Sequence, residues 1–318
     1  MNAKSPRPRR GAVRAPGGAR RPVVVALGAA GDLAGTLARR LGATRAKDPT
    51  RLFPDGETHV RVTASVRGRD VVLVCGLDRP DERTLPALLT IATLRDLGAR
   101  SVGLVAPYLA YMRQDTRFAP GEGVTSVYYG KLLSEYVDWL VTVDPHLHRH
   151  RSLDAVYAIP AVALSAAPRI AAWIARHVRR PIVVGPDGES TQWVKAVAAE
   201  GDFPSMVLTK VRHGDRHVEI SRPDAQRWRA HTPVVVDDII STAGTMIATV
   251  RLLRRAGLEP PVCVGVHAVF ANGAYAGLRR AGAARVVTCN TIPHRSNAID
   301  VTDVLADGVR RVLGSRAG

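Results

Sequence analysis

The sequence has few cysteines, few aromatic residues and no long apolar run. Its three cysteines, Cys75, Cys263 and Cys289, are far apart and fit neither a metal-ligand spacing nor a disulfide framework. We therefore expect reduced, buried thiols in a cytoplasmic protein. No segment approaches the roughly 20 apolar residues that a membrane-spanning helix needs. Residues 1–21 are basic, are rich in proline and glycine, and lack the apolar stretch of a secretory signal. The sequence thus predicts a disordered basic tail and no membrane partner.

Lysine is also scarce, with five residues among the 45 basic ones, whereas arginine is abundant. The formal net charge of +17 is of the kind found in proteins that bind nucleic acids. However, the arginines accompany abundant alanine and glycine, which indicates a bias of genomic composition, and no nucleic-acid-binding module is recognisable. A basic chain also suits a small polyanionic substrate. We therefore expect no nucleic-acid partner.

Buried strands and amphipathic helices alternate along the chain, and the alternation starts twice. Apolar runs predict strands in the first half at 23–27, 70–75, 102–106 and 139–143. They predict strands in the second half at 181–184, 206–210, 234–236, 262–269 and 285–289. This alternation is typical of parallel sheets covered by helices. With 318 residues, the sequence predicts an α/β fold of two domains, each a parallel sheet flanked by helices.

The most informative stretch runs from Val234 to Thr245. A buried strand is followed by two carboxylates and then by a turn of small residues that opens a helix. The backbone N–H groups of such a turn, with the helix start and nearby hydroxyls, suit a phosphate. The carboxylates would repel that phosphate and suit the vicinal hydroxyls of a sugar, or a magnesium ion. The pattern predicts a ribose 5-phosphate site made of Asp237, Asp238, Ser241, Thr242, Ala243, Gly244 and Thr245. A solvated strand end is the alternative.

A loop of the first half has the side chains that an adenine base requires. Pro54 and Gly56 make a turn that presents Phe53, Asp55 and Glu57. The aromatic ring can stack on a base, and the two acceptors can bind its amino group. The same Pro-Asp-Gly pattern also occurs in ordinary hairpins.

A second loop follows the predicted strand at 102–106. Functional groups of α/β sheets gather at the carboxyl ends of strands, where Arg113, Gln114 and Arg117 would lie. Arginine offers a planar fork for phosphate groups. An ordinary surface loop is the alternative.

Histidine and aspartate follow the predicted strand at 139–143. This combination, Asp144 with His146, His148 and His150, suits a divalent metal. For His148 and His150 we prefer a solvated loop.

Further along, Lys210 and Arg212 precede a glycine-containing loop and are the candidates for stabilising a transition state, with a surface pair as the alternative.

These motifs together resemble those of the phosphoribosyl pyrophosphate synthetases. Residues 234–245 resemble the ribose-phosphate loop that these enzymes share with type I phosphoribosyltransferases. The loops at 53–57 and 107–117 resemble ATP-holding motifs that only the synthetases have. The resemblance runs from about residue 23 to residue 312. The chain departs from the family pattern at Thr116, Pro145, Glu189 and Ser190.

The resemblance implies a ribose-phosphate diphosphokinase that transfers the pyrophosphoryl group of ATP to O1 of ribose 5-phosphate, with Mg²⁺ as cofactor. It implies that ATP is bound by Phe53, Asp55, Glu57, Arg113, Gln114, Asp115 and His146. It also implies that His146 and Asp187 hold the metal, and that Lys210 and Arg212 act from a loop that closes over the phosphates.

For the architecture, the resemblance implies two tandem domains of the type I phosphoribosyltransferase kind, at 22–160 and 161–318. The C-terminal segment returns to the first domain, and the active site lies between the domains. The ATP site is shared between subunits, so we expect a homo-oligomer, as a hexamer or as dimer units. Two alternatives stay open: a phosphoribosyltransferase that consumes phosphoribosyl pyrophosphate, and a non-catalytic regulatory homologue.

Overall fold

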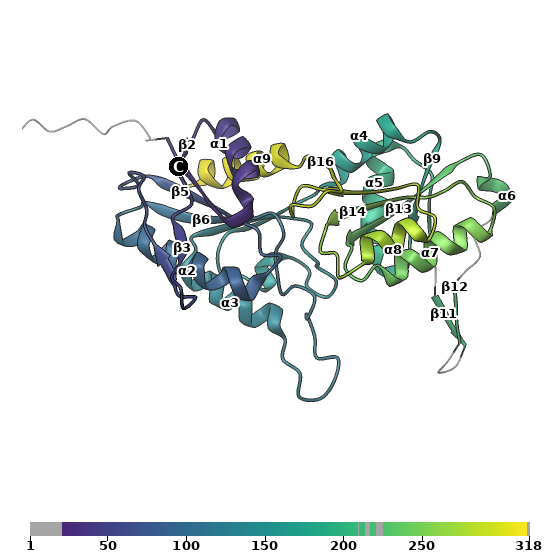
Figure 1. Ribbon diagram of the computed structural model, residues 1–318, viewed down its shortest axis with the longest axis horizontal. Coiled ribbons are helices and arrows are strands. Elements are labelled where there is room, and N and C mark those ends of the chain that lie inside the picture. Colours follow the sequence, from purple (N-terminus) through teal and green to yellow (C-terminus); the bar gives the residue numbers. More distant parts are fainter. Residues whose placement is uncertain (1–20, 209, 214–216, 221–224, 317–318) are drawn as a thin grey trace, which may run out of the picture.

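The computed structural model describes residues 21–208, 210–213, 217–220 and 225–316. Within these ranges the chain forms two six-stranded sheets that lie side by side, each flanked by helices (Figure 1). All neighbouring strands in both sheets are parallel, which confirms the predicted fold class. The predicted basic tail at 1–21 lies outside the described residues apart from Arg21. None of the helices in these ranges is long and apolar enough to cross a membrane.

The first sheet has the strand order β2-β1-β5-β6-β7-β8. Its strands are β1 (Val23–Leu27), β2 (Thr44–Arg45), β5 (Asp70–Cys75), β6 (Ser101–Ala106), β7 (Trp139–Val143) and β8 (Ala161–Leu164). Successive side chains of β1 point to opposite faces. One set shares a buried cluster with α1 (Gly31–Leu41), and the other with α2 (Pro80–Asp96) and α3 (Thr125–Tyr136). Because both faces are covered, the strands are continuous apolar runs.

The second sheet has the order β10-β9-β13-β14-β15-β16. Its strands are β9 (Pro181–Gly185), β10 (Ser205–Val207), β13 (Thr232–Ile239), β14 (Val262–His267), β15 (Arg285–Cys289) and β16 (Asn297–Ile299). Helices α4 (Ala167–His177) and α5 (Thr191–Gly201) contribute to the buried cluster on one face. Helices α7 (Gly244–Arg255) and α8 (Ala274–Arg280) contribute to the cluster on the other face. The short α6 (Ala225–Trp228) precedes β13.

The two sheets repeat one pattern of connection. The starting strand β1 lies between β2 and β5, and β9 likewise lies between β10 and β13. The chain first adds a strand on one side of the starting strand and then builds the rest of the sheet on its other side. The crevice at the carboxyl ends of these neighbouring strands is where open α/β sheets bind ligands. In the second sheet this crevice is formed by the ends of β9 and β13.

Two antiparallel hairpins lie outside the sheets. The first, β3 (Thr50–Leu52) with β4 (Thr58–Val60), carries residues 53–57 in its turn. The second is β11 (Lys210–His213) with β12 (His217–Ile220). Lys210 therefore begins a separate hairpin, and the predicted strand at 206–210 was wrong at its carboxyl end. The physical reason is that charged residues from Lys210 onward do not suit a sheet that is covered on both faces.

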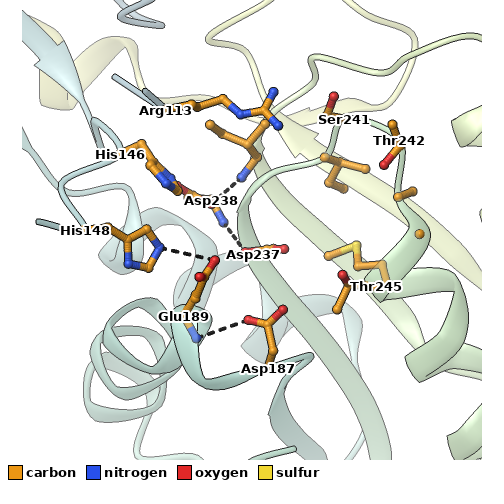
Figure 2. A pocket seen from close by; sticks show the side chains of 15 residues that line it. Arg113, His146, His148, Asp187, Glu189, Asp237, Asp238, Ser241, Thr242 and Thr245 are labelled. Atoms are coloured by element: carbon orange, nitrogen blue, oxygen red, sulfur yellow. Dashed lines mark hydrogen bonds and ion pairs between the residues drawn. The ribbon is translucent and has the colours of Figure 1, made fainter. Parts of the chain in front are cut away.

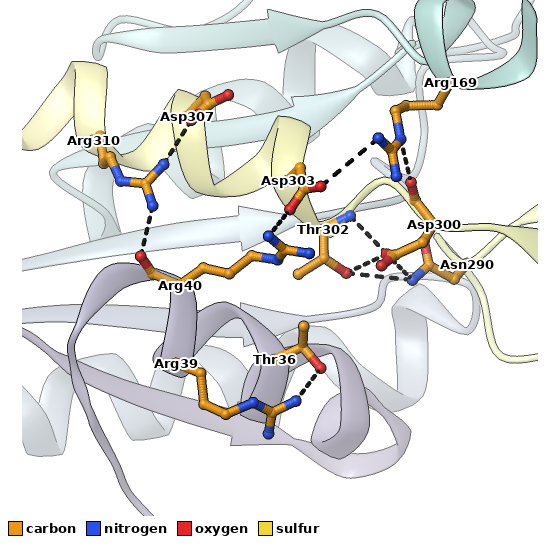
Figure 3. Close-up of polar contacts among 10 residues, drawn as sticks. All are labelled: Thr36, Arg39, Arg40, Arg169, Asn290, Asp300, Thr302, Asp303, Asp307 and Arg310. Atoms are coloured by element: carbon orange, nitrogen blue, oxygen red, sulfur yellow. Dashed lines mark hydrogen bonds and ion pairs between the residues drawn. The ribbon is translucent and has the colours of Figure 1, made fainter. Parts of the chain in front are cut away.

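The last helix, α9 (Thr302–Ser315), returns to the first sheet and packs beside α1 (Figure 1). Asp303 of α9 pairs with Arg40 of α1, and its Oδ2 lies 3.7 Å from Nη1 of Arg169 in α4 (Figure 3). These contacts tie the end of the chain to both halves. The predicted domain boundary at residue 160 stays a prediction. Strand β8, which follows that boundary, pairs with β7 and so belongs to the first sheet.

Candidate active site

A cavity of about 200 Å³ lies at the carboxyl ends of β9 and β13, where the two halves of the chain meet (Figure 2). The second half supplies the loop after β9 and the turn between β13 and α7. The first half supplies Arg113 from the loop after β6, and His146 and His148 from the loop after β7. The predicted ribose 5-phosphate residues and part of the predicted ATP site therefore line one cavity.

The two aspartates lie inside β13, whereas the sequence analysis placed them just after the strand. Asp237 pairs in register with Gly265 of β14. Strand pairing uses backbone hydrogen bonds, so it continues through a residue with a polar side chain. Asp238 is 4% exposed and accepts a hydrogen bond from Nδ1–H of His146 at 2.6 Å. This contact joins the first sheet to the second. It also leaves Nε2 of His146 as the ring nitrogen available to a ligand.

The two aspartates have opposite electrostatic settings. Burial raises the pKa of Asp237 well above its usual range, and the charges of Asp238 and Asp187 raise it further. Burial also acts to raise the pKa of Asp238, but the hydrogen bond and the charge of His146 outweigh burial and lower that pKa. Of the two carboxyl groups, Asp237 therefore holds its proton more tightly and Asp238 ionises more readily.

The turn from Ser241 to Gly244 forms one wall of the cavity. Ala243, at the N-cap of α7, has φ of +60° and ψ of +15°, and its side chain provides no cap for the helix. A non-glycine residue in this left-handed conformation is strained, and such strain is concentrated at functional sites. The uncapped N–H groups at the start of α7, beside the hydroxyls of Ser241, Thr242 and Thr245, are suited to an anion.

The loop after β9 places two more carboxylates at the cavity. Asp187 accepts a hydrogen bond from the backbone N–H of Glu189 at 3.1 Å, which fixes the short turn at 188–190. Oε2 of Glu189 lies 3.9 Å from Nε2 of His148. The side chain of His148 is largely enclosed, so the preference for a solvated loop was wrong for His148. The loop turns inward and brings His146 and His148 to the same cavity, and no local sequence pattern indicates this turn.

Not all predicted site residues reach this cavity. Oε1 of Gln114 accepts a hydrogen bond from the hydroxyl of Thr125 at 3.0 Å, and neither Gln114 nor Asp115 lines the cavity. Asp115 is buried and pairs with Arg149, with 2.8 Å between Oδ1 and Nη1. These side chains hold the two loops of the first half together and so position Arg113 and His146.

The Phe53 hairpin also does not line the cavity of its own chain. Phe53 is 39% exposed, contacts His59 edge to face at 5.5 Å, and lies 4.6 Å below the Arg51 guanidinium. Asp55 accepts a hydrogen bond from the backbone N–H of Glu57 at 3.2 Å, which stabilises the turn. For Lys210 and Arg212 the backbone lies on β11, and their side chains lie outside the described residues.

Two largely enclosed residues lie behind the cavity, and from the sequence only Asp144 was considered, as a possible metal ligand. Burial raises the pKa of Asp144 to about 7, and Asp144 accepts a hydrogen bond from the N–H of Ala166 at 2.7 Å. Burial lowers the pKa of His267 to about 4, and its ring nitrogens contact the Thr291 hydroxyl and the Asp144 carbonyl oxygen. A histidine that ends an otherwise apolar strand was the available signal for His267.

The donor set of the cavity suits a magnesium ion that keeps substrate and water ligands. No three histidine, cysteine or carboxylate side chains of the described ranges converge closely enough to hold a metal by themselves. Mg²⁺ is usually bound by one or two carboxylates together with substrate phosphates and water. Asp187, Asp237 and Asp238 provide such carboxylates around one cavity.

Comparison with known families now identifies the two halves of the chain. Residues 23–136 match the N-terminal domain of ribose phosphate pyrophosphokinase, and residues 152–304 match the phosphoribosyl transferase domain. The chain belongs to the ribose-phosphate pyrophosphokinase family. It is 32% identical to the ribose-phosphate pyrophosphokinase of Saccharolobus solfataricus, over 85% of this chain and 92% of that protein. It is also 32% identical to that of Methanopyrus kandleri, over 92% of this chain and the whole of that protein.

A solved structure shows that the fold is also that of the family. The phosphoribosylpyrophosphate synthetase from Mycobacterium smegmatis superposes with a TM-score of 0.81 at 24% identity, over 93% of this chain and 100% of that one. The predicted tandem arrangement is therefore confirmed at the level of fold.

Proposed function

We propose that this chain is a ribose-phosphate diphosphokinase, which converts ATP and ribose 5-phosphate to phosphoribosyl pyrophosphate and AMP. The observation that carries the proposal is the meeting of two sites in one cavity. The turn at 241–245 offers an anion cradle beside the aspartate pair, and Arg113 and His146 enter the same cavity from the first half. Membership of the pyrophosphokinase family supports the same activity.

In the proposed mechanism, the turn at 241–245 holds the 5-phosphate, and Asp237 and Asp238 accept hydrogen bonds from the ribose hydroxyls. This places the 1-hydroxyl of the sugar toward the first half of the chain. Arg113 and His146 hold the phosphates of ATP there. The oxygen of the 1-hydroxyl attacks the β-phosphorus, the bond from that phosphorus to the AMP oxygen breaks, and the hydroxyl proton passes to solvent water. Such a transfer depends on positioning and on the neutralisation of charge.

Magnesium is the cofactor that this donor set suits, with His146 and Asp187 as its proposed protein ligands. When bound, the ion neutralises negative charge on the transferred phosphates. The four carboxylates of the cavity, Asp187, Glu189, Asp237 and Asp238, face a single described arginine, Arg113. Two polyanionic substrates therefore need additional positive charge. We propose that Lys210 and Arg212 of the β11–β12 hairpin contribute it at the transition state.

The Phe53 hairpin is proposed to serve the cavity of a second copy of the chain, since it does not line the cavity of its own. Phe53, Asp55 and Glu57 would then bind the adenine base of ATP on the partner, with Gln114 and Asp115 fixing the adjacent loop. This requires a homo-oligomer. A cytoplasmic location is proposed because Cys75, Cys263 and Cys289 are free and buried, as expected of thiols that stay reduced.

The alternatives are less well supported. A phosphoribosyltransferase that consumes phosphoribosyl pyrophosphate would need only the second half, whereas the first half matches a domain of the pyrophosphokinases. A regulatory homologue would not need Lys210 and Arg212, which this chain retains.

The test of the proposal is AMP release from ATP, with and without ribose 5-phosphate, for the wild type and two lysine variants. Lys210→Ala should lower kcat by about 100-fold or more while ATP still binds, because it removes a charge that acts in the transition state. Lys47→Ala removes an exposed lysine that does not line the cavity and should retain full activity. Equal activity of both variants would remove Lys210 from the mechanism, and AMP release that does not depend on the sugar would contradict the proposed reaction.

A further inference from the structure

A second cavity lies in the first half, at the place that corresponds to the active cavity. The two sheets share one pattern of connection, and the active cavity lies at the carboxyl ends of β9 and β13. The corresponding strands of the first sheet are β1 and β5. A cavity of about 170 Å³ lies at their carboxyl ends, and the loop after β15 closes it from the second half. Open α/β sheets bind ligands at such a crevice. The two cavities share no lining residue, so this one is a separate site.

Arg83 of α2 lines this cavity and presents an unused donor edge. Its Nη1 donates to the carbonyl oxygen of Gly76 at 2.8 Å and to Oδ1 of Asp78 at 2.6 Å. A Cβ at position 76 would lie 3.2 Å from both of these side-chain atoms, so glycine permits the close arrangement. No described residue accepts a hydrogen bond from Nε or Nη2. The guanidinium group is therefore held in place, with two donors left for a planar carboxylate.

Asp32 of α1 adds a charge of the opposite sign to the same cavity. Its carboxylate is exposed and has no hydrogen-bond or ion-pair partner among the described residues. It does not pair with Arg83, whose ion-pair partner is Asp78. Within the described ranges, Asp32 and Arg83 are the charged residues that line the cavity. A phosphate would need an excess of positive charge, which these two groups do not provide.

The other polar side chains of the lining are engaged within the fold. Nδ2 of Asn290 donates to Oδ1 of Asp300 at 2.8 Å (Figure 3), and its Oδ1 accepts from the N–H of Val301 at 2.9 Å. The amide of Asn297 is likewise engaged through both its nitrogen and its oxygen. Between these groups the lining is apolar, with Ala29, Ala30, Leu33, Pro107 and Pro293. A ligand in this cavity therefore meets two opposite charges and apolar surface.

We propose that this cavity binds a small α-amino acid with an apolar side chain. The carboxylate of the amino acid accepts from Nε and Nη2 of Arg83, its ammonium group donates to Asp32, and its side chain contacts the apolar lining. A cavity of about 150 Å³ holds a molecule of the size of benzene. The space of about 170 Å³ is therefore suited to an amino acid such as valine. The inference stands apart from the proposed reaction, because binding is measured without ATP or ribose 5-phosphate.

The experiment is a ligand-observed nuclear magnetic resonance titration of the full chain with L-valine. At about 10 mM valine, a dissociation constant of about 1 mM would fill about 90% of the sites. Two analogues each lack one of the charged groups: isovalerate has no ammonium group and isobutylamine has no carboxylate. Valine should bind about tenfold or more tightly than either analogue, because only valine satisfies both charged residues.

Two substitutions test the two charged contacts. Arg83→Lys keeps the positive charge beside Asp78 but removes the planar fork, and it should weaken valine binding by about tenfold or more. Asp32→Asn removes the charge of an exposed residue and should weaken binding by a similar factor. Asp96→Asn, at an exposed position of α2 that does not line the cavity, is the matched control and should leave binding unchanged.

Three results would overturn the inference. The first is no binding of glycine, alanine, valine or leucine at the same concentration, and the second is binding of valine that either Asp32→Asn or Arg83→Lys leaves unchanged. The third is displacement of valine by an equal concentration of inorganic phosphate, which would indicate a simple anion site. AMP release measured on the same variants tests the proposed reaction separately, because neither substitution alters a residue that lines the active cavity.

Discussion

Asp237 and Asp238 are adjacent, yet the structure predicts a large loss of stability when Asp238 is replaced by asparagine and almost none when Asp237 is replaced. Asp238 is ionised and accepts the 2.6 Å hydrogen bond from His146 that joins the two halves. A hydrogen bond to a charged group contributes about 1.5–3 kcal/mol. Asp238→Asn should therefore lower the free energy of unfolding by about 2 kcal/mol, or roughly 30-fold in the equilibrium constant. Burial makes the charged form of Asp237 unfavourable, so Asp237→Asn removes no favourable charge interaction and should change stability by less than about 0.5 kcal/mol.

The pH dependence provides a second check on the same pair. The pKa of Asp238 is lowered in the folded chain, so the stability that it contributes is present above the unfolded pKa near 3.9. That stability is lost as the pH falls through the folded value. The difference between wild type and Asp238→Asn should therefore be full at pH 7 and should shrink below about pH 4. The measurement is urea-induced unfolding in metal-free buffer at both pH values. Equal losses for the two variants, or a larger loss for Asp237→Asn, would refute the assignment of charge within the pair.

Three further predictions follow from other residues. Because burial raises the pKa of Asp144 to about 7, its proton is held more tightly in the folded chain, so its contribution to stability falls between about pH 4 and 7. Asp144→Asn should remove that fall, of the order of 4 kcal/mol, in urea titrations, and an unchanged pH profile would contradict the burial of Asp144. A Cβ at Gly103 would lie 1.9 Å from the Trp139 ring, so Gly103→Ala should destabilise the fold by about 3 kcal/mol or prevent folding. Gly314 lies in open space, so Gly314→Ala should leave stability unchanged or raise it. Calorimetry on both variants measures the difference. Arg113→Ala should raise KM for ATP by about tenfold or more. The Nε of Arg117 donates to the Glu122 carbonyl oxygen, so Arg117→Ala should change KM far less. Equal effects of the two variants would contradict a role for Arg113 in binding ATP.

The fold was predictable because both sheets are buried on both faces. Strands such as Asp70–Cys75 and Trp139–Val143 are continuous apolar runs, and their bounds agree with the prediction. Short edge strands such as β2 and β16 have no such signal, because few of their residues face a core. The return of α9 to α1 depends on contacts between residues about 270 positions apart, such as Arg310 with Arg40, which no local pattern encodes. That return was expected only from the family resemblance.

The cavity was predictable where its residues are close in sequence. The stretch from Asp237 to Thr245 contains strand end, turn and helix start, so its chemistry could be read locally. The contacts of His146 with Asp238 and of His148 with Glu189 join loops of different halves, and only the folded chain brings them together. Asp115 shows the opposite case, because a residue that the family resemblance assigns to ATP binding is the buried partner of Arg149 in this structure.

The central claim is that this chain transfers a pyrophosphoryl group from ATP to ribose 5-phosphate. The most direct measurement is the stoichiometry of products, followed by ³¹P nuclear magnetic resonance on the wild type with ATP, Mg²⁺ and ribose 5-phosphate. The account predicts AMP and phosphoribosyl pyrophosphate in equal amounts, with no ADP and no free phosphate. ADP together with a sugar bisphosphate would indicate transfer of a single phosphoryl group from a kinase site. Consumption of added phosphoribosyl pyrophosphate with a nucleobase, and no AMP from ATP, would indicate a transferase and would contradict the account.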